Sequence, residues 1–265
     1  KKKEKKRKRK KEKNKTFLRR TFMLVSFARL VPLCPTSTKD FSRISGIAPF
    51  SSNVSAGFLI YGPERCGKTS ILFHFATQVV SFAGGPVHFV CSRKKVEASS
   101  PLLAPLASWT DKAFSEIQMK YVKNSSDILR YASCLHLSEL KPKAVVVDDL
   151  SELLGASKHS SPNKLAQVLA FLSDAVQQCG PCPLIVTEIG NKEPPNFLFA
   201  YQRWLQTILC IRPALPPSSY TLEVHPLSKE AGTMDRELNV AVQYTISGSK
   251  IFASGLQPKA LRSPW

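Results

Sequence analysis

The sequence predicts an α/β fold with a mostly parallel central sheet flanked by helices, and an antiparallel extension of the sheet towards the C-terminal end. From residue 58 onward, apolar runs of strand length alternate with helical patterns. Near-continuous apolar strands are typical of parallel sheets that are covered on both faces. Three further strand-like runs have no helix between them and predict the antiparallel extension: 205–211, 220–224 and 240–246.

A glycine-rich turn joins the first strand to the first helix. The apolar run 58–61 ends at Gly62, and the helical pattern 69–82 is apolar on most of its faces, as in a buried helix. The turn 62–69 fits the pattern G-x-x-x-x-G-K-[ST] at every position. Such a loop points backbone N–H groups at phosphate oxygens, and the following helix adds the positive end of its dipole. The predicted nucleotide-binding residues of this P-loop are Gly62, Pro63, Glu64, Arg65, Cys66, Gly67, Lys68, Thr69 and Ser70.

Two aspartates follow the purely aliphatic run 144–147. An aspartate at the end of a buried strand beside a phosphate-binding loop can hold Mg²⁺ directly or through water. We expect Thr69 and Asp148 to coordinate Mg²⁺ beside the phosphates of the nucleotide. Asp149 is a possible second acid, or a residue that caps the turn into the next element.

The remaining elements alternate in the same way along the chain. Asn124, with Asp127 three residues later, is typical of the start of a helix. The predicted elements are a strand at 87–91, a strand at 117–121, a helix from 124 to 135, a helix from 162 that closes at Gly180, and a strand at 184–186.

The order of these motifs resembles the ATPase core of the RecA/RadA recombinases. Within that superfamily, the chain is most similar to the small SWIM-domain-associated ATPase of the Shu-type recombination complex. The shared features are a near-bare core, a strand at 117–121 before a short helix, and Val145-Val146-Val147-Asp148 running into 150–154. The resemblance implies an ATP-binding accessory protein of homologous recombination repair. It also implies that the protein binds single-stranded DNA, a SWIM-type zinc-finger protein and the recombinase machinery.

Composition and the extent of this resemblance together divide the chain into four expected segments. They are a disordered basic tail at 1–20, a linker or possible targeting segment at 21–55, a RecA-like P-loop ATPase domain at 56–255 and a C-terminal tail at 256–265.

The sequence departs from the recombinase pattern just past the second strand. Recombinases carry a glutamate there, which polarises the attacking water. In this chain Cys91 is followed by a serine and three basic residues that end at Lys95, and the nearest acid is Glu97. A cationic side chain cannot accept a proton, and loss of a positioned base costs about 10²–10⁴ in rate. We therefore expect nucleotide binding with slow hydrolysis, and we assign no catalytic residue.

Two segments are expected to meet DNA, because DNA-binding loops emerge at these places in RecA-like proteins. They are 155–164 and 190–204. Cations that track phosphates beside aromatic rings that stack bases suit single strands. The candidate DNA contacts are Lys158, Lys164, Lys192 and Arg203. We expect the aromatic residues Phe197 and Phe199 to pack as core.

The positive charge of the chain is concentrated in its first residues. The formal net charge is +19, and 14 of the 38 lysines and arginines lie in residues 1–20. Such a run can act as a nuclear-import signal or as a nonspecific nucleic-acid tether; a solubilising tail and non-native residues remain open alternatives. Residues 16–43 are similar to an organellar transit peptide. We expect a nuclear protein, with the mitochondrion or plastid as the alternative.

The seven scattered cysteines suit a reducing compartment. Cys179 and Cys182 form a C-x-x-C pair, but it follows a predicted helix, where the dipole does not stabilise a thiolate. The histidines show no ligand spacing, so we expect no protein zinc site. No apolar run approaches the roughly 18–20 residues that cross a bilayer, so we expect no membrane association.

Two other functions stay open at this stage. One is a nucleotide-gated scaffold without catalysis, which the missing glutamate favours. The other is a small-molecule P-loop kinase, although the arginine-rich lid typical of such kinases is not found between Asp149 and Glu188.

Overall fold

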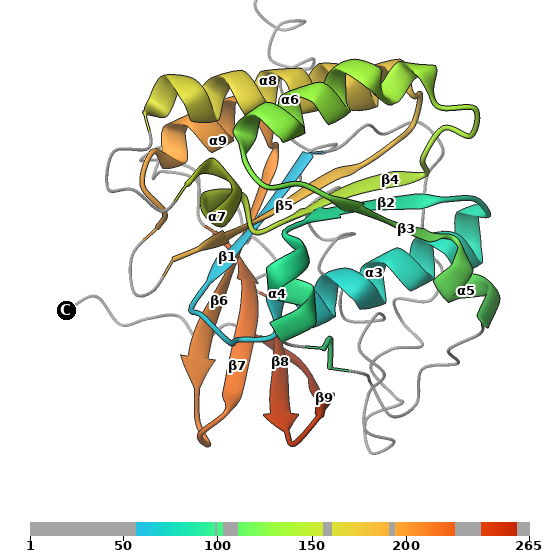
Figure 1. Cartoon of the computed structure of the whole chain (residues 1–265). Coiled ribbons are helices and arrows are strands. Elements are labelled where there is room, and N and C mark those ends of the chain that lie inside the picture. Colours follow the sequence, from blue (N-terminus) through green and yellow to red (C-terminus); the bar gives the residue numbers. More distant parts are fainter. Residues whose placement is uncertain are drawn as a thin grey trace, which may run out of the picture.

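Within the residues that the structure describes, the chain forms one 9-stranded sheet with helices on both faces (Figure 1). The computed structural model describes residues 57–98, 100–102, 111–155, 161–190, 194–225 and 240–258. The expected basic tail, the segment 21–55, and the candidate DNA contacts Lys158 and Lys192 therefore lie outside the described residues.

Strands and helices alternate up to the sixth strand, and strands alone follow. The strands are β1 (Gly57–Gly62), β2 (Val87–Cys91), β3 (Ile117–Tyr121), β4 (Ala144–Asp148), β5 (Leu184–Ile189), β6 (Thr207–Ala214), β7 (Ser219–Val224), β8 (Val240–Ser247) and β9 (Lys250–Pro258). The helices are α3 (Lys68–Ala83), α4 (Arg93–Ala98), α5 (Asp111–Ser115), α6 (Ser125–Cys134), the 3₁₀ turn η2 (Leu135–Leu137), α7 (Leu150–Leu154), α8 (Pro162–Gln178) and α9 (Leu198–Trp204).

The sheet has two parts that differ in strand direction. Its order is β3-β2-β4-β5-β1-β6-β7-β8-β9. The pairings from β3 across to β6 are parallel, and those from β6 to β9 are antiparallel. The predicted fold class, a mostly parallel sheet with an antiparallel extension, is therefore confirmed. The carboxyl ends of the parallel strands share one edge, which is where α/β sheets bind their ligands.

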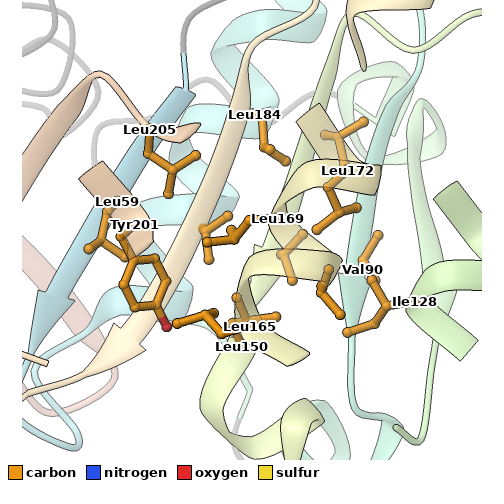
Figure 2. Packing of buried hydrophobic residues seen from close by; sticks show 14 of the residues in the cluster. Leu59, Val90, Ile128, Leu150, Leu165, Leu169, Leu172, Leu184, Tyr201 and Leu205 are labelled. Carbon is orange, nitrogen blue, oxygen red and sulfur yellow. The ribbon is translucent and has the colours of Figure 1, made fainter. Parts of the chain in front are cut away.

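Each face of the parallel part carries its own apolar core. Helices α3 and α5 cover one face, and their core includes Phe75 and Phe89. Helices α6, α7, α8 and α9 cover the other face (Figure 1). There Leu165, Leu169 and Leu172 of α8 lie over the sheet with Tyr201 of α9 beside them (Figure 2). Because the central strands are buried on both sides, their sequences read as continuous apolar runs.

Two predicted helix starts are capped as the sequence indicates. The Asn124 side chain accepts a hydrogen bond from the Asp127 backbone N–H at 3.1 Å, at the beginning of α6. Ser161 caps α8 in the same way, and Pro162 occupies the first turn, where its missing N–H costs nothing.

The structure differs from the sequence-based expectations in three places. Most of the second half of segment 190–204, expected as a loop, is the short helix α9. Phe199 on this helix is 66% exposed, so the expectation that it packs as core is wrong; Phe197 is half-buried against the core. Strand β9 extends to Pro258, so the first residues of the expected tail belong to the sheet. Its pairing with β8 supplies backbone hydrogen bonds that no apolar pattern signals.

Candidate functional site

The predicted P-loop lies between β1 and the first turn of α3, at the carboxyl edge of the parallel strands. Gly67 has φ 83°, a left-handed conformation that favours glycine, and it directly precedes the helix. A Cβ on Gly62 would come within 2.7 Å of Ile211 Cβ on β6, so only glycine fits at the start of the loop. Both motif glycines are therefore required by the backbone path.

The Lys68 ammonium is held across this loop. Its Nζ donates to the carbonyl oxygens of Gly62 at 2.9 Å and of Pro63 at 2.6 Å, and the residue is 6% exposed. An isolated buried ammonium would be costly, and the two carbonyls offset that cost. The positive charge thus lies inside the curl of the loop, where a phosphate would be bound.

Asp148 joins the loop to the neighbouring strands. Its Oδ2 accepts a hydrogen bond from Thr69 Oγ1 at 2.7 Å, and its Oδ1 accepts one from Thr187 Oγ1 at 2.6 Å. Asp148 ends β4 and Thr187 lies in β5, so the carboxylate links α3 to two adjacent strands. The sequence therefore predicts correctly which residues meet: Thr69 and Asp148 lie together, although 79 residues separate them.

These donors fit a magnesium ion. The Thr69 hydroxyl donates its hydrogen to Asp148, which leaves its oxygen lone pairs for a cation. Carboxylate and hydroxyl oxygens are the ligands that Mg²⁺ prefers, together with water and phosphate oxygens. The Thr69 hydroxyl would coordinate the ion directly. The Asp148 carboxylate would hold it either directly or through a water molecule.

The other predicted loop residues divide into exposed and buried ones. Glu64 and Arg65 are exposed, Pro63 is half-buried, and Cys66 and Ser70 are buried. The Ser70 hydroxyl accepts a hydrogen bond from the Leu102 backbone N–H at 2.8 Å, so this side chain anchors a neighbouring segment. Burial raises the pKa of the Cys66 thiol, so it stays neutral near pH 7.

The antiparallel extension supports the P-loop from the side opposite β5. The Tyr244 hydroxyl donates to the Cys66 carbonyl oxygen at 2.6 Å, and the Tyr220 ring stacks on the Tyr244 ring at 5.5 Å. A Cβ on Gly67 would lie 3.2 Å from Ile246 Cδ1. Sequence reasoning missed this support, because a contact between β8 and the loop leaves no local pattern.

Lys95 is a site residue whose position the sequence did not reveal. Its Nζ lies 3.0 Å from Asp148 Oδ1 and 3.5 Å from Asp149 Oδ2. Burial acts to lower the pKa of Lys95, but Asp148 and Asp149 outweigh it and the pKa is raised overall. Burial raises the pKa of Asp149, and Lys95 opposes that shift. The basic run after Cys91 places a positive charge near the end of β2. The run alone does not show which of its side chains turns towards the site.

Glu188 is a further acid near this edge that sequence reasoning did not assign. It lies near the end of β5, beside Tyr61 of β1 in the register of the sheet. Its Oε2 accepts a hydrogen bond from the Tyr201 hydroxyl, and its Oε1 accepts one from the Ile189 backbone N–H at 3.1 Å. Burial raises the pKa of this carboxyl group. Tyr201, expected as part of a DNA-facing segment, is buried and holds Glu188.

The two described candidate DNA contacts are exposed cations. Lys164 lies in the first turn of α8 and its Nζ donates to the Leu154 carbonyl oxygen at 3.3 Å. Arg203 lies on α9 with its guanidinium 5.4 Å from the Trp204 ring centroid. Both are exposed to solvent, and their binding to DNA stays a prediction.

The described residues contain no cluster of three or more His, Cys, Asp or Glu side chains that could hold a metal ion. Burial raises the pKa of both thiols of the C-x-x-C pair, that of Cys182 to about 12.

None of the described helices combines the length and the hydropathy that a membrane crossing requires.

Fold and site together define a RecA-like α/β protein with a P-loop at the carboxyl edge of its parallel strands. No protein-family model and no curated protein matches the sequence. Among solved structures, the chain is similar to a KaiC-like protein from the hyperthermophilic archaeon Pyrococcus horikoshii OT3, with a TM-score of 0.52 and 14% identity. The match covers 76% of this chain and 90% of the archaeal one. At this identity the likeness shows the fold, and it confirms the RecA-like fold expected from the sequence.

Proposed function

We propose that this chain binds ATP with Mg²⁺ in the loop formed by residues 62–70 and hydrolyses it slowly. The observation that carries the proposal is the meeting of Lys68, Thr69 and Asp148 at the carboxyl edge of the sheet. Lys68 and Thr69 begin α3, and Asp148 ends β4, 79 residues further along the chain than Thr69.

Each group has a distinct part in binding. The backbone N–H groups of the loop and the first turn of α3 would bind the phosphates. The Lys68 ammonium would move from the Gly62 and Pro63 carbonyls to the terminal phosphates, exchanging neutral acceptors for charged ones. Mg²⁺ held by Thr69 and Asp148 would supply further charge neutralisation.

Slow hydrolysis follows from what surrounds the loop. At the position past β2 where recombinases carry a glutamate, this chain presents the Lys95 ammonium. Glu188 lies at the same edge, but its two oxygens accept hydrogen bonds from Tyr201 and Ile189. An ammonium cannot take up the proton of the attacking water, and the Glu188 carboxylate is already engaged by two donors.

The setting that we propose is homologous recombination repair in the nucleus. The support is the resemblance to the SWIM-associated ATPase, together with the net charge of +19 and the exposed cations Lys164 and Arg203. In this setting the chain would bind single-stranded DNA and a SWIM-type zinc-finger protein. Co-purification of the full chain with a SWIM protein tests the partnership, and its loss in the presence of single-stranded competitor DNA would show bridging by nucleic acid instead.

The position of Lys95 also favours a second function, a nucleotide-gated scaffold without catalysis. The two functions differ in turnover. We expect the purified chain to hydrolyse ATP at about 10⁻³ to 10⁻¹ per second, given typical rates and the missing base. A rate near one per second would contradict slow hydrolysis. If the wild-type chain releases no more phosphate than Lys68→Ala does, the result would favour the scaffold.

Direct measurement of nucleotide affinity tests the core of the proposal. Fluorescently labelled ATP should bind the wild-type chain, and Lys68→Ala should weaken binding by about tenfold or more, because a charge-assisted contact is lost. Lys141→Ala, which removes an exposed lysine remote in sequence from the loop, is the matched control. Equal affinity of wild type and Lys68→Ala would overturn the assignment.

A further inference from the structure

Of the three consecutive basic residues after β2, one turns into the site. Arg93 is exposed, lies 4.8 Å from the Tyr121 ring centroid and pairs with Glu97 at 3.9 Å. Lys94 is exposed to solvent. The Lys95 side chain is 23% exposed, and its ammonium contacts both aspartates at the end of β4. A merely solubilising basic turn would not direct one ammonium onto two buried carboxylates.

The sheet fixes this direction. Cys91 pairs with Asp148 in the register of β2 and β4, so the two strands end side by side. Helix α4 begins two residues after Cys91, and its first turn brings Lys95 back over the end of β4. The Lys95 ammonium therefore donates a hydrogen bond to Asp148 Oδ1. The other oxygen of this carboxylate, Oδ2, accepts the hydrogen bond from Thr69.

The acceptor capacity of Asp148 is nearly used in this arrangement. An ionised carboxylate offers about four lone-pair sites. Thr69, Thr187 and Lys95 together take three of them. A cation at Thr69 would therefore share Asp148 with an ammonium, and the two positive charges would repel each other in a poorly hydrated site. The ammonium itself carries three N–H donors; one donates to Asp148 Oδ1, and the Asp149 carboxylate lies 3.5 Å away as an ion-pair partner.

We propose that the Lys95 ammonium supplies part of the positive charge that a divalent cation brings to the triphosphate, so that this chain binds nucleotide with only weak dependence on Mg²⁺. The inference rests on the proposed function, because it requires nucleotide in the P-loop. It assigns Lys95 as a second lysine for the phosphates, which would approach them from α4 while Lys68 approaches them from the P-loop. Mg²⁺ still fits at Thr69, but it becomes an aid to binding and not a condition for it.

The test compares the affinity for fluorescently labelled ATP in excess MgCl₂ with the affinity in excess EDTA. We expect the wild-type dissociation constant to rise by less than about threefold in EDTA. Lys95→Gln, which removes the charge but keeps a polar side chain one atom shorter, should lose about tenfold or more in EDTA and recover in MgCl₂. Lys94→Gln removes a charge from the exposed neighbour and should behave as wild type. Lys95→Arg should restore part of the EDTA tolerance.

The outcomes separate the two proposals. A wild-type chain that binds ATP in MgCl₂ but loses about tenfold or more in EDTA overturns the role of Lys95 and leaves nucleotide binding intact. Equal EDTA tolerance of wild type and Lys95→Gln also overturns it. No binding by the wild type in either buffer overturns both proposals. The ratio of the wild-type dissociation constants in EDTA and in MgCl₂ needs no variant. The test therefore stands even if Lys95→Gln fails to fold.

A direct metal measurement gives a second readout. Mn²⁺ binding to the nucleotide-free chain, followed by electron paramagnetic resonance, should be about tenfold tighter in Lys95→Gln than in wild type, because a like charge is removed from beside Asp148. Unchanged Mn²⁺ affinity would contradict competition between Lys95 and the metal.

Discussion

The Tyr244 hydroxyl donates a hydrogen bond to the Cys66 carbonyl oxygen at 2.6 Å, across 178 residues of sequence. This contact ties the antiparallel extension to the tightest part of the P-loop. Tyr244 is buried, and its ring stacks on Tyr220. The shape of the P-loop therefore depends on strands that lie outside the parallel core.

The first prediction follows from this contact. Tyr244→Phe keeps the ring and its packing but leaves the buried Cys66 carbonyl without this donor. We expect the free energy of unfolding to fall by about 1–3 kcal/mol and the affinity for labelled ATP to fall with it. Urea denaturation and nucleotide titration measure the two effects. Tyr220→Phe makes the same chemical change on the neighbouring ring, and an equal loss there would contradict a specific role for the Tyr244 hydroxyl.

The second prediction concerns the charge balance at the end of β4. Asp148 is 0% exposed and compensates the Lys95 ammonium, so Asp148→Ala leaves a partly buried cation with Asp149 alone. Removal of one partner of a buried pair is strongly destabilising, and we expect a loss of about 2–4 kcal/mol in urea unfolding.

Two further variants check this explanation. Asp174→Ala removes an exposed carboxylate from α8 and should cost less than about 0.5 kcal/mol. The double variant Asp148→Ala with Lys95→Met removes the ammonium together with its closer partner and should recover part of the stability, while Asp149 keeps the hydrogen bond from Ser151 Oγ at 3.0 Å. A double variant that is less stable than Asp148→Ala would show that the loss has another cause.

The P-loop and its aspartate could be predicted from the sequence because each is written in a short, local pattern. The run from Gly62 to Thr69 predicts a P-loop, and the aliphatic run before Asp148 predicts a buried strand. Parallel strands bring their carboxyl ends to one edge of the sheet. The Thr69–Asp148 hydrogen bond follows from these two facts.

The remaining parts of the site could not be predicted, because they depend on tertiary contacts. Lys95 turns inward through the first turn of α4, and Lys94 beside it does not; nothing in three basic residues distinguishes them. Tyr201 reads as an aromatic residue of a DNA-facing segment, whereas the short helix α9 buries it against Glu188. Phe199, on the same helix, reads as core and is exposed.

The third prediction concerns pH. The pKa of His74 and that of His88 are lowered from 6.5 to about 4, chiefly by burial, and the Lys120 charge contributes to the shift of His88. Between these values the unfolded chain binds more protons than the folded one, so stability is full above pH 6.5 and is lost as the pH falls towards 4. Each histidine would contribute up to about 3 kcal/mol over this window.

Urea unfolding at several pH values between 4.5 and 7 measures this slope. Burial raises the pKa of Glu188 and Asp149, which acts in the opposite direction, so the informative quantity is the difference between variants. His88→Asn should give a shallower loss of stability at low pH than wild type. His136→Asn changes an exposed histidine and should leave the slope unchanged. Parallel curves for wild type and His88→Asn would refute the assignment of buried, neutral His88.

The fourth prediction addresses DNA. Replacing Lys158, Lys164, Lys192 and Arg203 together by alanine should weaken binding to a labelled single-stranded oligonucleotide and reduce the dependence of affinity on salt. Each lost phosphate contact on a single strand lowers the slope of log affinity against log salt by about 0.7. A control variant removes four exposed cations elsewhere: Lys94, Lys123, Arg130 and Lys141. The two variants have the same net charge, so an equal effect of both would show that binding follows overall charge and not these segments. Unchanged affinity and salt slope in the first variant would remove α8, α9 and the segments before them from the DNA-binding surface.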